Sequence, residues 1–253
     1  MSNPNENLLL RSLAVDDRLR LMPNLQPVSL SLGQVICEPG RSLLSGYLPT
    51  SGVVSLVYTT EDGATAEMAI VGNDGIVGAS IVLGGQCTWG QAVVAVAGEG
   101  YKIPAASLLH EFNGCVAWRS IILRYVQALL TQVAQTAVCN RLHSVEQRLC
   151  RWLLLCHDRT ESSEFLMTQE LIAHMLGGRR ESVTVAAGHL QDLGLIHYCR
   201  GHITIIDRGR LAASACECYR VVEEEYVRLF GRRHDRQVSR MSVAIEEAGT
   251  GKF

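Results

Sequence analysis

The chain is 253 residues long, with 47% hydrophobic and 19% charged residues and a formal net charge of −2. This composition excludes an intrinsically disordered chain, and the length suffices for one large domain or two small ones. The charge balance excludes a uniformly basic protein, although a local basic face would still permit nucleic-acid binding. No apolar run approaches the roughly 18 residues of a transmembrane helix, and the nine Cys residues lack disulfide-like spacing. We therefore expect a cytoplasmic protein that contacts no membrane.

Residues 21–114 have the pattern of a small β domain, and residues 1–20 form a separate N-terminal segment. Short apolar runs, such as 52–58 and 92–96, are separated by glycine-rich turns. The pair Asp62-Gly63 lies between two such runs, which is a strong signal for a β-hairpin. Many short strands with glycine turns are typical of a barrel or jelly roll, so we expect a β-roll.

A long helix is predicted over residues 115–140. Apolar and small polar residues recur in it at alternating steps of four and three, which is the spacing of a seam between two paired helices. We therefore expect a homodimer whose contact residues are Ile122, Val126, Leu129, Val133, Thr136 and Asn140. The alternative is an amphipathic helix that lies on its own β domain.

Residues 141–230 contain a helix-turn-helix pattern. Counted from Gln169, small Ala173 is fifth, Gly177 is ninth and branched Val183 is fifteenth. Two helices that cross closely need a small residue at the crossing, a residue tolerant of positive φ in the turn, and an apolar residue on the second helix. Residues 195–207 predict two strands around Arg200-Gly201, and a last helix is expected over 211–230.

If these helices are buried as predicted, the start of the second one is exposed and polar. Arg and Glu side chains there could contact guanine and cytosine edges, and a helix N-terminus favours phosphate. The alternative is a helical hairpin, or a repurposed helix-turn-helix scaffold that binds only protein or an effector. The candidate DNA-contacting residues are Thr168, Gln169, Arg179, Arg180, Glu181, Ser182, Thr184, Arg200 and His202.

The stretch "MTQELIAHMLGGRRESVT", followed by "GLIHYCRGHITIID", resembles the Crp/Fnr family of bacterial transcription regulators. The resemblance implies an α+β fold with an N-terminal β-roll, jelly-roll-like and similar to cyclic-nucleotide-binding domains, a long dimerisation helix and a C-terminal winged helix-turn-helix. These parts fall on residues 21–114, 115–140 and 141–230, followed by a flexible tail over 231–253. The resemblance also implies a homodimer on a pseudo-palindromic DNA site, with RNA polymerase as a partner.

Within the resemblance, residues at the positions of Arg180 and Glu181 contact bases, and Ser182 lies against phosphate. Val185 occupies a position that is often basic in the cyclic-AMP-responsive members. The target sequence of this chain is therefore expected to differ from theirs.

The sensor domain is not expected to bind cyclic AMP. The family's phosphate-binding segment contains a Glu and, some ten residues later, an Arg; here the Glu position is Ala79, and residues 73–101 contain no Arg or Lys. A buried phosphate without a cationic partner is costly. The sequence does not identify an effector.

No metal or cofactor is predicted. Cys216 and Cys218 are too few for a zinc site and, on one helix, would point apart. Residues 21–105 contain no His that could form a catalytic metal centre with carboxylates, and the chain has no nucleophile-elbow, phosphate-binding-loop or dinucleotide motif. We therefore expect a protein that is not an enzyme.

Overall fold

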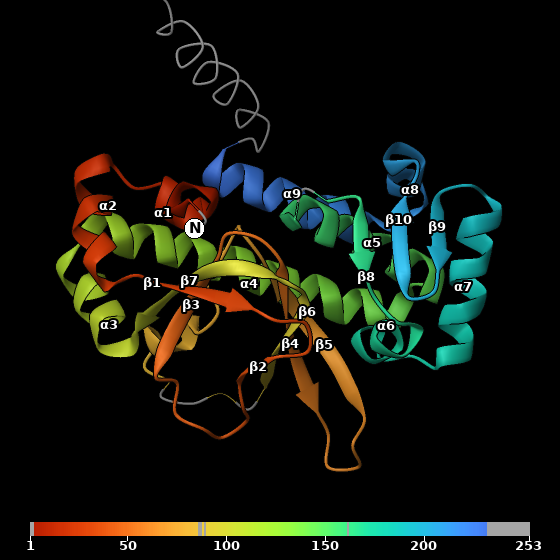
Figure 1. Ribbon diagram of the computed structural model, residues 1–253, viewed down its shortest axis with the longest axis horizontal. Coiled ribbons are helices and arrows are strands. Elements are labelled where there is room, and N and C mark those ends of the chain that lie inside the picture. Colours follow the sequence, from red (N-terminus) through yellow and green to blue (C-terminus); the bar gives the residue numbers. More distant parts are fainter. Residues whose placement is uncertain (1–2, 86–87, 89, 161, 232–253) are drawn as a thin grey trace, which may run out of the picture.

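The computed structural model describes residues 3–85, 88, 90–160 and 162–231. A β domain and a smaller helical domain lie at opposite ends of the molecule, and two long helices run between them (Figure 1). None of the helices in this described part is long and apolar enough to cross a membrane. The predicted tail over 231–253 lies outside the described residues, apart from Gly231.

The β domain consists of two antiparallel sheets. One has the order β1-β7-β3 and the other the order β2-β6-β4-β5. The predicted hairpin at Asp62-Gly63 is confirmed, because Thr59 of β4 pairs with Thr65 of β5. The strands are β1 (Gln26–Leu30), β2 (Val35–Cys37), β3 (Ser45–Pro49), β4 (Val53–Thr59), β5 (Thr65–Val71), β6 (Gln91–Val96) and β7 (Gly98–Pro104).

Short helices close the ends of this roll. Asn7 is buried and accepts a hydrogen bond from the Leu9 amide at 3.0 Å, so it caps the first helix. Its amide nitrogen donates to the carbonyl oxygens of Pro49 and Gly75. The N-terminal segment is thereby joined to the roll. The helices are η1 (Pro4–Glu6), α1 (Leu8–Arg11), α2 (Val15–Leu21), η2 (Met22–Asn24), η3 (Ala79–Ile81) and α3 (Ala105–Gly114).

The predicted long helix is α4 (Val116–Leu142), and it ends two residues beyond the expected boundary. One face is buried against the roll through residues such as Trp118, Tyr125 and Gln132. The Tyr125 hydroxyl donates to the Ile76 carbonyl at 3.0 Å, and the Gln132 side chain donates to the Ile70 carbonyl at 3.2 Å.

The smaller domain begins with α5 (Val145–Thr160), which is buried along most of its length. Its remaining elements surround one apolar core, to which residues such as Leu153, Ile172, Val183 and Ile203 contribute. A three-stranded sheet has the order β8-β10-β9. The elements are β8 (Glu164–Leu166), α6 (Gln169–Leu176), α7 (Arg180–Asp192), β9 (Ile196–Cys199), β10 (His202–Ile205) and α8 (Arg208–Ser214).

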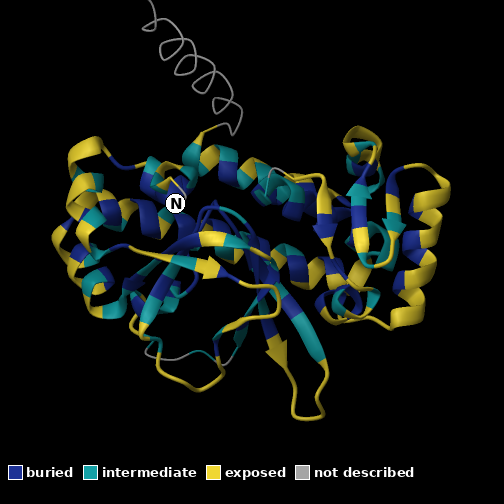
Figure 2. Ribbon diagram, in the orientation of Figure 1, coloured by how far each residue is buried: buried dark blue, intermediate teal, exposed yellow. Residues whose placement is uncertain are grey.

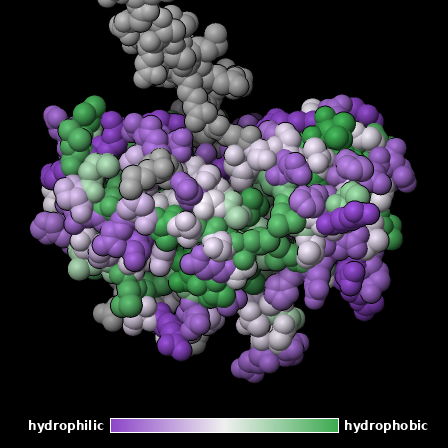
Figure 3. Space-filling model, viewed as in Figure 1, coloured by the Kyte–Doolittle hydropathy of each residue, from purple (hydrophilic) through white to green (hydrophobic). Residues whose placement is uncertain are grey.

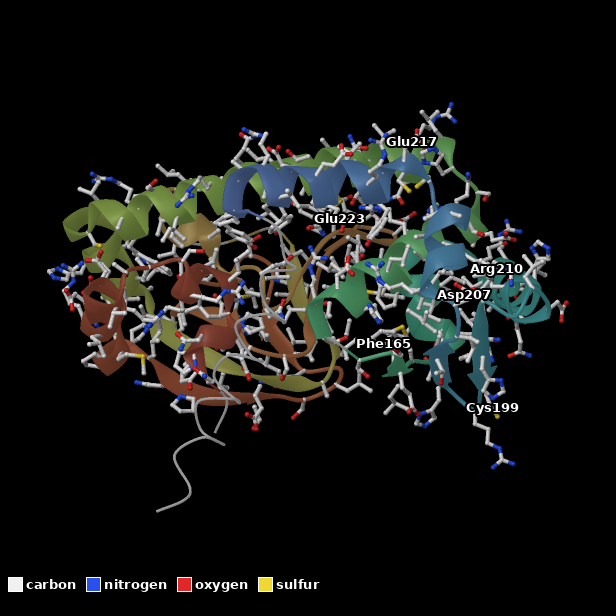
Figure 4. The ribbon with its side chains drawn as sticks, turned by 90° about the horizontal axis from the view of Figure 1, so that it is seen from above. Phe165, Cys199, Asp207, Arg210, Glu217 and Glu223 are labelled. Atoms are coloured by element: carbon white, nitrogen blue, oxygen red, sulfur yellow. The ribbon has the colours of Figure 1, made fainter. Side chains whose placement is uncertain are left out.

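The last predicted helix is two helices in the structure. Asp207 caps α8, Ala215 and Cys216 are extended, and α9 (Glu217–Phe230) then starts in a new direction. Figure 4 shows α9 beside α4. The two helices are antiparallel, because Glu225 contacts Gln127 whereas the later Leu229 contacts the earlier Arg124.

Buried polar contacts join the smaller domain to the roll. The Trp152 indole donates to Glu67 at 3.1 Å, and Ser55 also hydrogen-bonds this carboxylate. Arg159 forms a fully buried salt bridge with Asp74 at 2.9 Å. Figure 2 shows the buried residues concentrated where the roll, α4 and α5 meet. Removing one polar side chain from such a network destabilises the folded protein, because it leaves another buried polar group without its partner.

Candidate nucleic-acid interface

The turn between α6 and α7 has the geometry that the sequence predicts. Gly177 adopts a left-handed conformation with φ 57°, and Ala173 and Val183 are buried between the helices. A Cβ atom at Gly177 would lie 3.3 Å from the Thr65 carbonyl oxygen of the β4–β5 hairpin, so this position is both conformationally and sterically restricted. Thr168 caps α6 by accepting from the Leu171 amide at 3.1 Å.

The start of α7 is exposed. Arg179 precedes the helix and Arg180 begins it, and no salt bridge within the described part of the chain neutralises either guanidinium. Backbone N–H groups at the start of a helix favour phosphate, and so do the two guanidinium groups beside them. The start of α7 therefore favours a partner that carries phosphate. Figure 3 shows hydrophilic side chains at the end of the molecule where α6 and α7 lie. The exposed residues here are Arg179, Arg180, Glu181, Ser182, Thr184 and Val185.

Two of the predicted contact residues already have partners within the domain. The Thr184 hydroxyl lies 2.9 Å from the Gln169 side-chain oxygen and 3.0 Å from the Arg180 carbonyl. This contact connects the first turn of α6 to α7. Thr184 and Gln169 therefore position α7 relative to α6, and both lie beside the exposed face of α7.

The predicted wing is the β9–β10 hairpin. Arg200 and Gly201 have φ values of 49° and 82°, which matches the two-residue turn with both central residues at positive φ. Arg200 is exposed at the tip, and Figure 4 shows the neighbouring Cys199 at the outer end of the hairpin. His202 is also exposed, but its Nδ1 lies 3.3 Å from Glu164 of β8.

Two known domain families match the chain. The cyclic nucleotide-binding domain matches residues 27–114, and the Crp-like helix-turn-helix domain matches residues 147–214. Together they cover more than half of the chain, in the order of the Crp/Fnr regulators. The chain belongs to the Crp/Fnr family. A comparison with curated proteins found no match.

Solved structures of the Crp/Fnr type have the same fold. A family regulator from Eubacterium rectale is 19% identical, with a TM-score of 0.64 over 83% of this chain and 98% of its own. FixK2 from Bradyrhizobium japonicum is 16% identical, with a TM-score of 0.65 over 76% and 98%. The c-di-GMP-responsive regulator CLP from Xanthomonas campestris is 16% identical, with a TM-score of 0.60 over 77% and 100%.

The structure corrects part of the expected dimer seam on α4. Ile122 is 0% exposed and Thr136 is 5% exposed within the single chain, so neither can contact a partner in this conformation. Val126 and Leu129 are half-buried and line a cavity of the chain's own roll. Val133 is also half-buried, and Asn140 is exposed. The predicted seam therefore includes positions on the face of α4 that packs on the roll.

Most of the residues that line that cavity belong to the part of the chain that the cyclic nucleotide-binding domain matches. It has a volume of about 270 Å³ and lies between the roll and α4. Apolar side chains form most of its wall, and Ala79 is among them; none of the described residues that line it is charged. The polar side chains among the described lining residues include Tyr58, Ser80, Thr88 and Gln91.

The expectation that the Cys216 and Cys218 side chains point apart is wrong. Cys216 is not inside a helix: it is the extended residue before α9, with φ −75° and ψ 162°. Its side chain therefore points to the same place as that of Cys218, and both are buried with Cys139 of α4. Spacing along the chain gave no indication of this cluster, because its other members are more than 70 residues away in sequence.

Proposed function

We propose that this chain is a homodimeric transcription regulator that binds specific double-stranded DNA sequences with α7. The observation that supports this most is the exposed start of α7, which follows the turn at Gly177. Arg179 and Arg180 lie there without a salt-bridge partner among the described residues. Such a helix start enters the major groove in helix-turn-helix proteins. In this proposal, Arg180 and Glu181 contact bases, and backbone phosphates are contacted by Arg179, Ser182 and the wing residues Arg200 and His202.

The dimer would place two recognition helices on one pseudo-palindromic site. Two-fold symmetry then requires two half-sites whose centres are about one helical turn of DNA, or ~34 Å, apart. Val185 is 73% exposed on the same helix, and its apolar side chain would contact a thymine methyl group more favourably than a guanine edge. The preferred half-site is therefore expected to differ from that of members with a basic residue there.

The test begins with selection of genomic fragments by the purified chain, followed by titration of the best fragment. Arg180→Ala should weaken specific binding by about 1–3 kcal/mol, or roughly 5- to 150-fold, because it removes a base contact. Non-specific binding should change far less. Arg220→Ala is the matched control, since Arg220 is an exposed arginine on α9, away from α7.

Two results would contradict the proposal. One is an affinity of Arg180→Ala equal to that of the unchanged chain at several salt concentrations. The other is a failure to enrich any sequence while Arg179, Arg180 and Arg200 prove dispensable, which would favour a helix-turn-helix scaffold that binds protein or an effector instead.

A further inference from the structure

Four metal-binding side chains meet where the end of α4 contacts the start of α9. They are Cys139 near the end of α4, His143 directly after it, Cys216 directly before α9, and Cys218 in its first turn. Their donor atoms all lie within 4.8 Å of one another. The three cysteines are buried, and the His143 side chain is 13% exposed.

The distances within this cluster resemble the edges of a metal-binding tetrahedron. With metal–sulfur bonds of about 2.3 Å and metal–nitrogen bonds of about 2.0 Å, tetrahedral geometry requires sulfur–sulfur edges of about 3.8 Å and sulfur–nitrogen edges of about 3.5 Å. The Cys139 and Cys216 sulfurs are 3.5 Å apart, and the Cys218 sulfur is 3.6 Å from Nδ1 of His143. Side-chain rotations that move a donor atom by less than about 1 Å would bring the longest donor–donor distances to these values.

The second nitrogen of His143 also has a suitable partner. Its Nε2 lies 3.4 Å from the carboxylate of Glu217, the residue between the two cysteines. Metal-binding histidines commonly donate their other N–H to a carboxylate, which fixes the ring and its tautomer. Figure 4 shows Glu217 at this junction of α9 with α4.

The surroundings favour thiolate ligands. The Arg151 guanidinium is buried and donates from Nη2 to Thr136 at 2.7 Å, three residues before Cys139 on α4. The start of α9 adds a partial positive charge, which further favours a thiolate.

We propose that Cys139, His143, Cys216 and Cys218 bind one Zn²⁺ ion and thereby fasten α9 to the end of α4. Three sulfurs and one nitrogen at tetrahedral spacing form the donor set of structural zinc, and four protein ligands leave no position for a substrate. Unlike Mg²⁺ and Ca²⁺, which prefer oxygen, Zn²⁺ accepts this set. The site is structural and lies outside the sensor cavity and the DNA-contacting face.

Metal analysis of the full-length chain purified in reductant tests the site. We expect one zinc per chain, and a loss to less than about a tenth in Cys139→Ser and Cys218→Ser, because ligand removal weakens such sites strongly. Cys115→Ser is the matched control: Cys115 is also buried, but it lies at the opposite end of α4. His143→Cys should retain zinc, since it supplies another thiolate, whereas His143→Ala should lose it.

Cobalt gives a second measurement on the unaltered chain, so the proposal stays testable if a variant fails to fold. Added Co²⁺ should produce the intense visible absorption of a tetrahedral cobalt–thiolate centre, and Zn²⁺ should abolish it. The proposal is overturned if the reduced chain neither retains zinc nor produces this absorption, or if the serine variants retain full zinc. Isolation of a Cys139–Cys216 disulfide together with no metal uptake after reduction would also overturn it. None of these readouts requires DNA, so they are independent of the proposed regulatory function.

Discussion

Glu67 is a carboxylic acid in a place where its charged form is costly. It is 7% exposed between β5 and α5, with Ser55 and Trp152 as hydrogen-bond partners. Burial raises its pKa from 4.5 to about 7, although both hydrogen bonds and the charges of Arg151 and Arg159 act in the opposite direction. Near neutral pH this one residue therefore changes protonation at the contact between the roll and the smaller domain.

The raised pKa predicts a pH-dependent stability. The folded chain holds the Glu67 proton more tightly than the unfolded chain, so the stabilisation is complete below about pH 4.5 and is lost as the pH rises through about 7. Between about pH 5 and pH 8, the free energy of unfolding should fall by up to about 3 kcal/mol more in the unchanged chain than in Glu67→Gln. Urea unfolding at one protein concentration measures this difference.

The control for this prediction is Glu61→Gln, because Glu61 is an exposed carboxylate in the turn of the same hairpin. It should keep the pH dependence of the unchanged chain. If the free energy of unfolding changes with pH in the same way in the unchanged chain and in Glu67→Gln, the Glu67 carboxyl is not protonated in the folded state near neutral pH.

At the scale of elements, α4 offers a seam one residue away from the one predicted. Moving three positions of the pattern forward by one residue replaces Ile122 by Leu123, Leu129 by Leu130 and Thr136 by Ala137. The other three positions of the predicted seam stay the same. The resulting set still alternates between steps of three and four. Leu123 and Leu130 are 48% and 59% exposed, and Val126 and Val133 are half-buried. We propose that the partner helix packs on Leu123, Val126, Leu130, Val133, Ala137 and Asn140.

Leu130→Glu should separate this dimer, because a charge in an apolar seam must be desolvated without a partner. Light scattering should give the mass of one chain at concentrations where the unchanged protein gives two. Leu19→Glu is the matched control, since Leu19 is an apolar residue of α2 with a similar exposure of 61%. A Leu130→Glu protein that stays dimeric would place the interface elsewhere.

The elements differ in how well their sequence predicts them. The helix-turn-helix depends on local requirements, and each position, such as Ala173 and Gly177, is specified by neighbours within one or two turns. The rotation of α4 is not specified locally, because Ile122 and Leu123 are both apolar and only tertiary packing decides which is buried. The direction of α9 and the cysteine cluster depend on the extended residues Ala215 and Cys216, and no turn signal marks these in the sequence.

At the scale of the whole molecule, apolar side chains form most of the wall of the cavity between the roll and α4. A cyclic nucleotide would place its phosphate in a cavity whose described lining has no charged residue. Desolvation of that phosphate would cost several kcal/mol without an ionic partner. We therefore propose that this cavity does not accept cyclic AMP.

Thermal unfolding with increasing cyclic AMP tests this. No saturable rise in melting temperature is expected, and DNA affinity should be unchanged. A ligand at about 100 times its dissociation constant stabilises a folded protein by about 2.7 kcal/mol, which is readily measured. A saturable rise with cyclic AMP that is absent with AMP would show that backbone amides alone suffice to bind the phosphate.

The return of α9 to α4 affects how the smaller domain is held in the molecule. The chain enters the smaller domain just after His143 and leaves it just before Cys216, and these two crossings lie next to each other, with the Cys139 and Cys216 sulfurs 3.5 Å apart. The winged helix is therefore held at two places: at these crossings, and at the roll through the buried contacts of Trp152 with Glu67 and of Arg159 with Asp74. A change in its orientation relative to the roll would have to break or rearrange those buried contacts.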